Sequence, residues 1–311
     1  MKIRHWAFFL VLLTMTFSLN AEAGILAGDP MVETPQHFIQ RSDSRMIEVD
    51  FVFPGVEISP LQNGEEAFDL IRLEGAGYTG TIGAPELPVV TRLFAIPDRA
   101  RVKVKSLIPE YKTYHNISAY PHQEYEYGHP QNTDMLEIDQ NYYGKSELFP
   151  AKWVTLGETA IMRDFRLIPV NVHPVRINPV TGEAQVLVGL HLELEFEDGA
   201  VENVKTRHFD KSVASFNEMY DDLIANYDWV NPNGVEVRGS LLVVYPNVGN
   251  VASILQPYLE WKKRLGYNVV AVSVANNAST ATVKTMIQQS YDTLDPPLEH
   301  VVLIGDAAGD I

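Results

Sequence analysis

Asp306 is the residue whose position in this sequence most suggests chemistry. It follows the apolar run Val301 to Ile304, which is typical of a parallel strand buried on both faces, and Gly305 turns the chain between them. In open α/β sheets, ligands and catalytic groups collect at the carboxyl ends of the strands. Gly305 and Asp306 are therefore candidates for an active-site edge, with capping of the following turn as the alternative role of Asp306.

No cofactor is identified from the sequence. Asp306 and Asp310 could serve a structural calcium ion, since calcium prefers carboxylate oxygens, but two acids in one loop do not assign a site. The sequence contains no P-loop, G-x-S-x-G or H-E-x-x-H motif. No metal site is predicted.

The segment GAGYTG, Gly75 to Gly80, matches the spacing of a dinucleotide-binding fingerprint. That fingerprint needs a helix to start at its third glycine, and Pro85 and Pro88 prevent one here. We therefore expect a glycine-rich β-turn.

Three evenly spaced histidines lie in the segment YHNISAYPHQEYEYGHPQ, together with two glutamates. They are His115, His122, His129, Glu124 and Glu126. Metal sites usually bring two ligands close together on one turn or strand, and this spacing does not. A Tyr- and Pro-rich surface loop is the favoured interpretation, with a zinc or copper site as the alternative.

The elements before Asp306 form a βαβαβ pattern. Strands are predicted at 240–245, 268–274 and 300–304. A helix capped by Asn250 ends at Gly266, and a second, capped by Thr280, ends before Pro296. Such short helical crossovers predict a parallel sheet. Three strands leave that sheet incomplete, so we expect the chain to be truncated.

Residues 44–197 show period-two alternation interrupted by Pro and Gly, which predicts a β-rich sandwich or barrel. Within it, a hairpin pairs a strand at 170–177 with one at 183–198. A helix is predicted within 210–229, capped by Asp210 or Ser212, and residues 231–239 form the linker. The predicted fold is thus a β-rich domain, residues 24–230, followed by an incomplete α/β domain, residues 240–311.

Residues 1–23 are typical of a secretory signal peptide, with basic residues before an apolar run and Ala21-Glu22-Ala23 as the cleavage motif. Cleavage is predicted between Ala23 and Gly24, so the protein is expected to be secreted or at the cell surface, with no membrane span after signal removal. The net charge of -16 argues against nucleic acid as a partner, and the sequence has 0 Cys.

Several stretches resemble the gingipain-type cysteine peptidases, relatives of the caspases. In the second half they include Tyr258 to Lys262, Gly266-Tyr267 and Ile304-Gly305-Asp306. In the first half, GAPELPVVTRLFAIPDRARVKV is similar to the propeptide of that family.

The resemblance implies a secreted zymogen of an endopeptidase that cleaves protein or peptide substrates. Its β-rich propeptide would assist folding and block the active-site cleft of its own catalytic domain until proteolysis removes it. Arg238 is the candidate processing site, with Lys205 and Arg207 as rivals. A Cys nucleophile and a His would perform catalysis, but no catalytic residue can be assigned within these residues, which are predicted to be inactive alone.

Two alternatives stay open at this point. The chain could be the amino-terminal part of a longer precursor, which we favour, or a degenerate relative that serves as a binding module. A third interpretation is a non-catalytic secreted binding or surface protein with a β-sandwich fused to a flavodoxin-like module. The aromatic segment Tyr111 to Tyr143 would then be its binding face.

Overall fold

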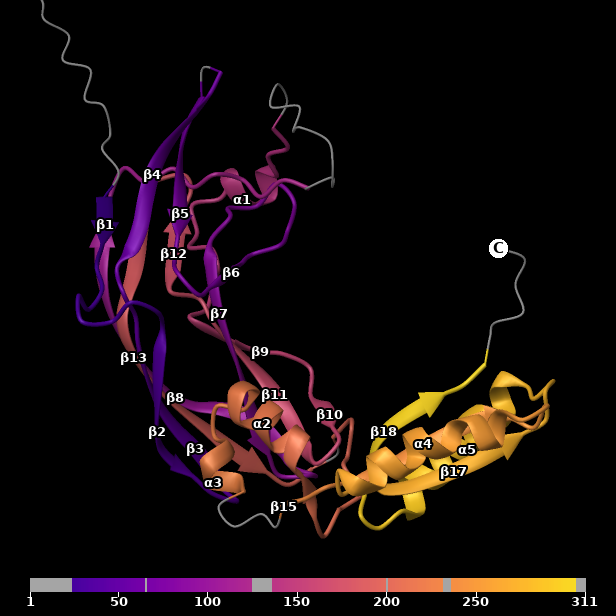
Figure 1. Ribbon diagram of the computed structural model, residues 1–311. Coiled ribbons are helices and arrows are strands. Elements are labelled where there is room, and N and C mark those ends of the chain that lie inside the picture. The colour runs from indigo at the N-terminus through magenta and orange to yellow at the C-terminus, as the bar shows by residue number, and fades with distance from the viewer. Residues whose placement is uncertain (1–23, 65, 125–135, 200, 232–235, 306–311) are drawn as a thin grey trace, which may run out of the picture.

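The computed structural model of the protein describes residues 24–305, apart from residues 65, 125–135, 200 and 232–235. An elongated unit of antiparallel strands, here the β unit, spans residues 24–230. A smaller α/β unit, residues 236–305, lies against one end of it (Figure 1).

The β unit contains fourteen strands and three helices among its described residues. The strands are β1 (Gly24–Leu26), β2 (Gln36–Ser42), β3 (Met46–Val52), β4 (Val56–Asn63), β5 (Glu66–Arg72), β6 (Gly77–Tyr78), β7 (Pro88–Ile96), β8 (Arg101–Tyr114), β9 (Val154–Leu156), β10 (Ala160–Met162), β11 (Phe165–Val172), β12 (Val175–Asn178), β13 (Glu183–Glu197) and β14 (Ser212–Val213). The helices are α1 (Gln140–Tyr143), α2 (Ala214–Leu223) and α3 (Tyr227–Val230).

Strand β13 organises the β unit. It pairs with β8 along one edge and with β12 and β3 along the other, and β2 continues that sheet beyond β3. A second sheet has the order β10-β11-β7-β6, with β9 also paired to β11, and β1-β4-β5 forms a third. Alternate residues of β3, β7, β11 and β13 meet between the two larger sheets in one apolar core. The predicted β-rich sandwich is confirmed.

The first strand of the predicted hairpin is divided between the two larger sheets. The segment predicted as one strand at 170–177 breaks at His173-Pro174, so that β11 belongs to the second sheet and β12 pairs with β13. The β12–β13 hairpin itself is present, with Gly182 at φ +67 in its turn. Pro174 has no N–H to donate at this point, and the N–H of His173 donates to the carbonyl of Trp153 at 2.8 Å.

Helix α2 covers the outer face of β7 and β11. Tyr220 and Ile224 pack there against Ala95 and Leu167. The predicted capping residues are wrong: Val213 is at the N-cap of α2, without a side-chain hydrogen bond. Ser212 and Val213 are instead paired in a short parallel ladder with β15 (Glu236–Val237), which competes with a capping role.

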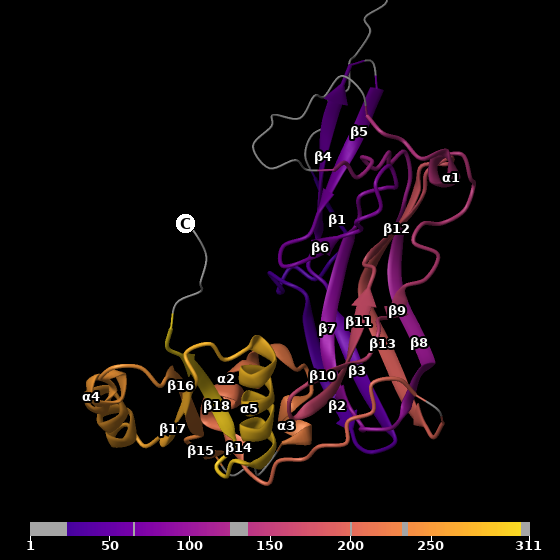
Figure 2. The same ribbon diagram turned by 90° about the vertical axis from the view of Figure 1, so that its right-hand side faces the viewer.

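The α/β unit contains β16 (Ser240–Pro246), α4 (Val251–Arg264), β17 (Asn268–Val274), α5 (Thr280–Thr293) and β18 (Leu298–Leu303). Its three longer strands are parallel in the order β17-β16-β18, as predicted. Leu241 and Val243 of β16 face α4, whereas Leu242 and Val244 face α5. The helices therefore cover opposite faces of the sheet (Figure 2).

Three local predictions for this unit need correction or refinement. Asn250 is the N-cap of α4 but makes no capping hydrogen bond through its side chain. Ser279, one residue before the predicted Thr280, caps α5 by accepting a hydrogen bond from the N–H of Thr282. Burial of the last strand on both faces is wrong, because Val301 and Leu303 are exposed on the described surface.

Candidate interdomain interface and active-site edge

Gly305 lies just beyond the carboxyl end of β18, at the edge of the sheet where the sequence predicts an active site. The N–H of Ile304 donates to the carbonyl of Val244 at 2.8 Å, which keeps the chain beside β16 up to this point. Asp306 and Asp310 lie outside the described residues. The roles of Gly305 and Asp306 remain predictions.

The β unit contacts the opposite edge of that sheet. Strand β18 starts beside β10 and points away from the β unit (Figure 1). Leu298, the first residue of β18, is 4% exposed and meets the turn between β10 and β11. The contacts between the two units therefore gather at the amino-terminal edge of the parallel sheet.

Arg163 is the central residue of this interface. It occupies the β10–β11 turn at φ +46, a conformation that side chains rarely adopt. Its Nη1 donates to the carbonyl of Leu298 at 2.7 Å. The guanidinium lies 4.7 Å from the ring centre of Phe209 and 4.4 Å from that of Phe216, so two aromatic faces hold it.

Arg207 adds a second guanidinium beside the first. It donates to the carboxylate of Asp292 and to the carbonyl of Tyr291, both on α5. Its guanidinium lies 4.3 Å from the ring centre of Tyr291, and Phe209 packs edge-on against the same ring with centroids 5.6 Å apart. Two arginines and three aromatic rings thus join the units.

Glu299 links three segments that are distant in sequence. Its side chain is 1% exposed. One oxygen accepts a hydrogen bond from the hydroxyl of Ser215 at 2.7 Å, and the other accepts one from the N–H of Gly239 at 2.8 Å. Lys211 and Asp295 form a further ion pair at 2.7 Å on the exposed rim.

The two strands that flank residues 232–235, β14 before them and β15 after them, are also paired with each other. Ser212 and Val213 of β14 pair in parallel with Glu236 and Val237 of β15. The buried Asn217 supports this ladder, because its Nδ2 donates to the Ser212 hydroxyl at 3.0 Å and to the Glu236 carboxylate at 2.8 Å. The contact therefore does not depend on the intervening backbone.

A polar pocket adjoins these contacts on the side of the β unit. Asp164 and Lys205 line it, as does Tyr220, whose hydroxyl donates to Asp164 Oδ2 at 2.8 Å. Burial raises the pKa of Asp164, although the Tyr220 hydroxyl and the charges of Arg163 and Lys205 act in the opposite direction. Burial likewise raises the pKa of Tyr220, so its hydroxyl stays protonated as a donor.

The three candidate processing residues differ in accessibility. Arg238 is exposed, but Gly239 after it is buried, and a side chain there would lie 2.6 Å from Glu299 Cβ. Lys205 is 6% exposed and lies 3.6 Å from Asp98, while Arg207 is paired with Asp292. A protease needs an extended, accessible segment, so the assignment of Arg238 remains a prediction that requires local opening.

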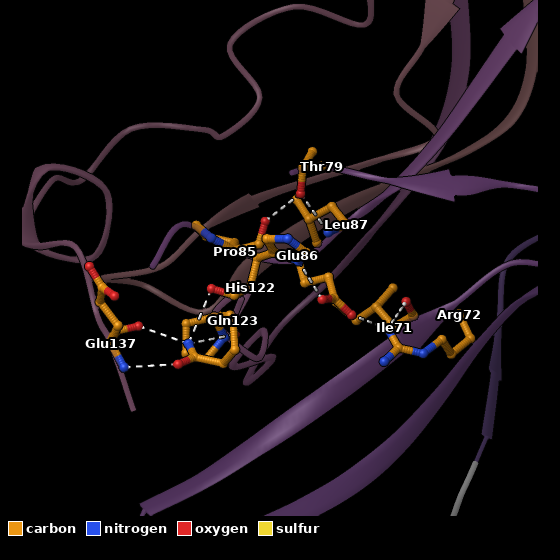
Figure 3. A network of polar contacts seen from close by, with 10 residues as sticks. Ile71, Arg72, Thr79, Pro85, Glu86, Leu87, His122, Gln123 and Glu137 are labelled. Atoms are coloured by element: carbon orange, nitrogen blue, oxygen red, sulfur yellow. Dashed lines mark hydrogen bonds and ion pairs between the residues drawn. The ribbon is translucent and has the colours of Figure 1, made fainter. Parts of the chain in front are cut away.

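The GAGYTG segment forms a turn that leads into β6, and β6 pairs with β7. No helix follows within the described residues to Pro88, as expected for a structural turn. Thr79 fixes the segment: its hydroxyl donates to the carbonyl of Pro85 at 2.7 Å and accepts from the N–H of Leu87 at 3.0 Å (Figure 3).

His122 belongs to the same network rather than to a metal site. Its Nδ1 lies 2.7 Å from the buried Glu86 carboxylate, which also accepts from Arg72 at 2.8 Å (Figure 3). His115 is exposed, whereas Glu126 and His129 lie outside the described residues. In the part of the chain that the structure describes, no three His, Asp or Glu side chains are arranged to hold a metal ion.

Gly24, the residue after the predicted signal cleavage, is the first residue of β1 and pairs with Ile58. Ala23 lies outside the described residues. None of the described helices is long and apolar enough to span a membrane.

The interface residues could not be identified from the sequence. Arg163, Tyr291 and Glu299 lie far apart along the chain, and no local pattern marks an arginine that stacks between distant rings. A β-sandwich packed against the start of a parallel α/β unit is the arrangement that the resemblance to a zymogen implies.

Comparison with known proteins agrees with this class. Residues 25–228 match the family model Propeptide_C25, and residues 236–311 match Peptidase family C25. Gingipain R2 of Porphyromonas gingivalis is 21% identical over 298 residues, which cover 94% of this chain and 39% of gingipain R2. Lys-gingipain of the same organism is 24% identical over 260 residues, covering 80% of this chain and 15% of that protein.

A solved structure, the complex of Porphyromonas gingivalis RgpB pro- and mature domains, matches with a TM-score of 0.57 at 19% identity. The match covers 64% of this chain and 100% of the matched one, which shows a shared fold. The chain belongs to the C25 peptidase family, as a gingipain-type precursor with its propeptide region, which confirms the resemblance in the sequence. It spans about two fifths of the length of gingipain R2.

Proposed function

We propose that this chain is the amino-terminal part of a secreted zymogen of a gingipain-like cysteine endopeptidase. The β unit is its inhibitory and folding-assisting propeptide. The observation that carries this proposal is the interface between Arg163, Arg207 and the α/β unit, since it couples the region matching the C25 propeptide to the region matching the C25 peptidase.

Cleavage of the linker would not by itself separate the two units. A cut after Arg238, the proposed processing site, would leave β14 and β15 together on the side of the β unit, and it would leave the contacts of Arg163 and Arg207 with β18 and α5 unchanged. The propeptide would then act as a bound inhibitor after processing. RgpB, whose pro- and mature domains form a complex, provides a precedent for such a bound state.

The interface would hold the β unit on the α/β unit, but it would not itself block the active site. It lies at the amino-terminal edge of the sheet, whereas Gly305 lies at the carboxyl-terminal edge. Inhibition therefore needs further contacts of the β unit near the catalytic groups. Binding at a remote anchor raises the effective concentration of any such inhibitory segment, so weak contacts at the active site suffice.

The chemistry would use residues of a longer precursor. A Cys thiolate would attack the scissile carbonyl, with a His moving protons, and the 311 residues contain 0 Cys. We therefore expect this chain alone to be inactive. Export would use residues 1–23 as a signal peptide, with removal before Gly24, and Arg238 is the proposed site of propeptide processing.

Peptide hydrolysis by a longer precursor tests the proposal. The rate is measured before and after release of the β unit, with and without a thiol-alkylating reagent. We expect low activity before release, a rise of at least tenfold after it, and abolition by the reagent. Activity that resists alkylation would refute a cysteine nucleophile, and equal rates before and after release would refute inhibition by the β unit.

A further inference from the structure

The α/β side of the interface has the chemistry of an arginine-binding site. Tyr291 and Asp292 of α5 and Leu298 of β18 present one carboxylate, two main-chain carbonyls and one aromatic face. All of these groups accept hydrogen bonds or attract cations. In the precursor, two guanidinium groups of the β unit occupy them.

The geometry favours a guanidinium over an ammonium. Arg207 uses Nη1 for the Asp292 carboxylate and Nη2 for the Tyr291 carbonyl, while the Cζ of the same group lies over the Tyr291 ring, 4.3 Å from its centre. Only a planar group with several donors can make these contacts together. Lys211, the lysine of the same segment, makes a simple ion pair with Asp295 on the rim.

The aromatic residue that follows completes the site. Phe209 packs edge-on against Tyr291 with ring centroids 5.6 Å apart, and it also lies 4.4 Å from the Arg207 guanidinium. The segment thus presents an arginine and, two positions later, an aromatic ring. Both are groups that carry a large share of binding energy at protein interfaces.

We propose that release of the β unit converts this surface into a binding site for arginine-bearing segments of other proteins, with a preference for an arginine followed two residues later by an aromatic residue. The inference rests on the proposed function, because it requires the β unit to leave. The site would bind basic partner proteins through contacts with α5 and β18. The acidic side chains of Asp292, Asp295 and Glu299 would favour the approach of such partners.

The full chain tests this without removal of the β unit. Arg207→Ala opens one guanidinium position beside Asp292 while Phe209 keeps the aromatic position against Tyr291, so N-acetyl-arginine-amide is the probe, followed by ligand-observed NMR. We expect saturable binding with a Kd on the order of 1 mM, as for a small ligand with about 4 kcal/mol of binding free energy. The wild-type chain, whose position is filled, should bind at least tenfold more weakly.

Two controls define the ligand and the site. The same probe with citrulline in place of arginine keeps the shape but removes the charge, and it should bind at least tenfold more weakly. Asp292→Asn in the Arg207→Ala background should weaken binding of the arginine probe by a similar factor. If circular dichroism shows that the Arg207→Ala protein is unfolded, Arg163→Ala replaces it. That substitution opens the second position, beside the Leu298 carbonyl.

Equal binding of the arginine and citrulline probes would overturn the proposal. So would the absence of binding to both folded, opened variants, or binding that Asp292→Asn leaves unchanged. These results are separate from those of the hydrolysis assay, because inhibition by the β unit can hold whether or not the vacated surface binds arginine.

Discussion

The Arg163 guanidinium on the β unit donates to the carbonyl of Leu298, the residue that starts β18, at 2.7 Å. Arg163→Met removes this charged hydrogen bond and the cation–π contacts with Phe209 and Phe216. We expect the coupling between the units to weaken by about 2 kcal/mol, which corresponds to a roughly 30-fold larger population of the open state. Amide hydrogen exchange of β18 measures that opening.

Lys211→Met is the matched control at the same interface. It breaks an exposed ion pair with Asp295, which contributes at most about 1 kcal/mol. Exchange in β18 should therefore change less than about fivefold. Equal effects of the two substitutions would show that Arg163 has no special role in holding the units together.

Arg166 should stabilise the β unit strongly although it has no carboxylate within hydrogen-bonding distance among the described residues. It is 2% exposed and donates to the carbonyls of Pro97, Ala100, Glu202 and Asn203 at 2.8–3.1 Å. Arg166→Met leaves these carbonyls without their donor, so we expect a loss of about 3 kcal/mol in the free energy of unfolding.

Chemical denaturation measures that loss. Arg99→Met, in the turn that the Arg166 guanidinium holds, provides the control, because Arg99 is exposed and its substitution should cost less than about 0.5 kcal/mol. An Arg166→Met protein as stable as the control would refute the role of Arg166.

Two histidines should give the β unit opposite responses to acid. Burial lowers the pKa of His173 below its ordinary value of 6.5, so the folded state resists protonation there. The Asp50 carboxylate, 2.7 Å from His191 Nδ1, raises the pKa of His191 above 6.5. Stability contributed by His173 is thus present above pH 6.5 and lost as pH falls toward its folded pKa.

The contribution of His191 has the reverse sign. It is fully present below pH 6.5 and disappears as pH rises through the raised pKa. We expect His173→Gln to reduce the loss of stability on acidification from pH 7 to 5, and His191→Gln to increase it, each compared with wild type by urea denaturation. Parallel pH profiles for both variants would contradict these assignments.

Alternation and helical spacing in the sequence are enough to predict the two kinds of architecture. Strand β13 and the order of strands and helices from Ser240 to Leu303 follow directly from them. The break at His173-Pro174 is not predicted, because a continuous apolar pattern hides a change of sheet. The exposure of Val301 and Leu303 is not predicted either, because a uniformly apolar strand does not show what covers it.

The interface lies beyond what local patterns can predict. The sequence predicts Ser212 as a helix cap, but it pairs with Glu236 instead, since a partner strand satisfies its backbone better than a helix start would. Arg163 depends on three rings from different segments, and Glu299 joins Ser215 to Gly239. Such sites arise from tertiary contacts between positions far apart in the sequence, here including Arg163 and Leu298 at a separation of 135 residues.

The most direct test of a β unit that stays bound as an inhibitor is peptide hydrolysis by a longer precursor whose linker has been cut, measured over a dilution series. The wild-type protein is compared with the Arg163→Met form. We predict that both stay latent when concentrated, and that the variant becomes active at a protein concentration about 30-fold higher than the wild type, because its β unit dissociates more readily. Full activity of both immediately after the cut, at every concentration, would contradict continued inhibition by the bound β unit.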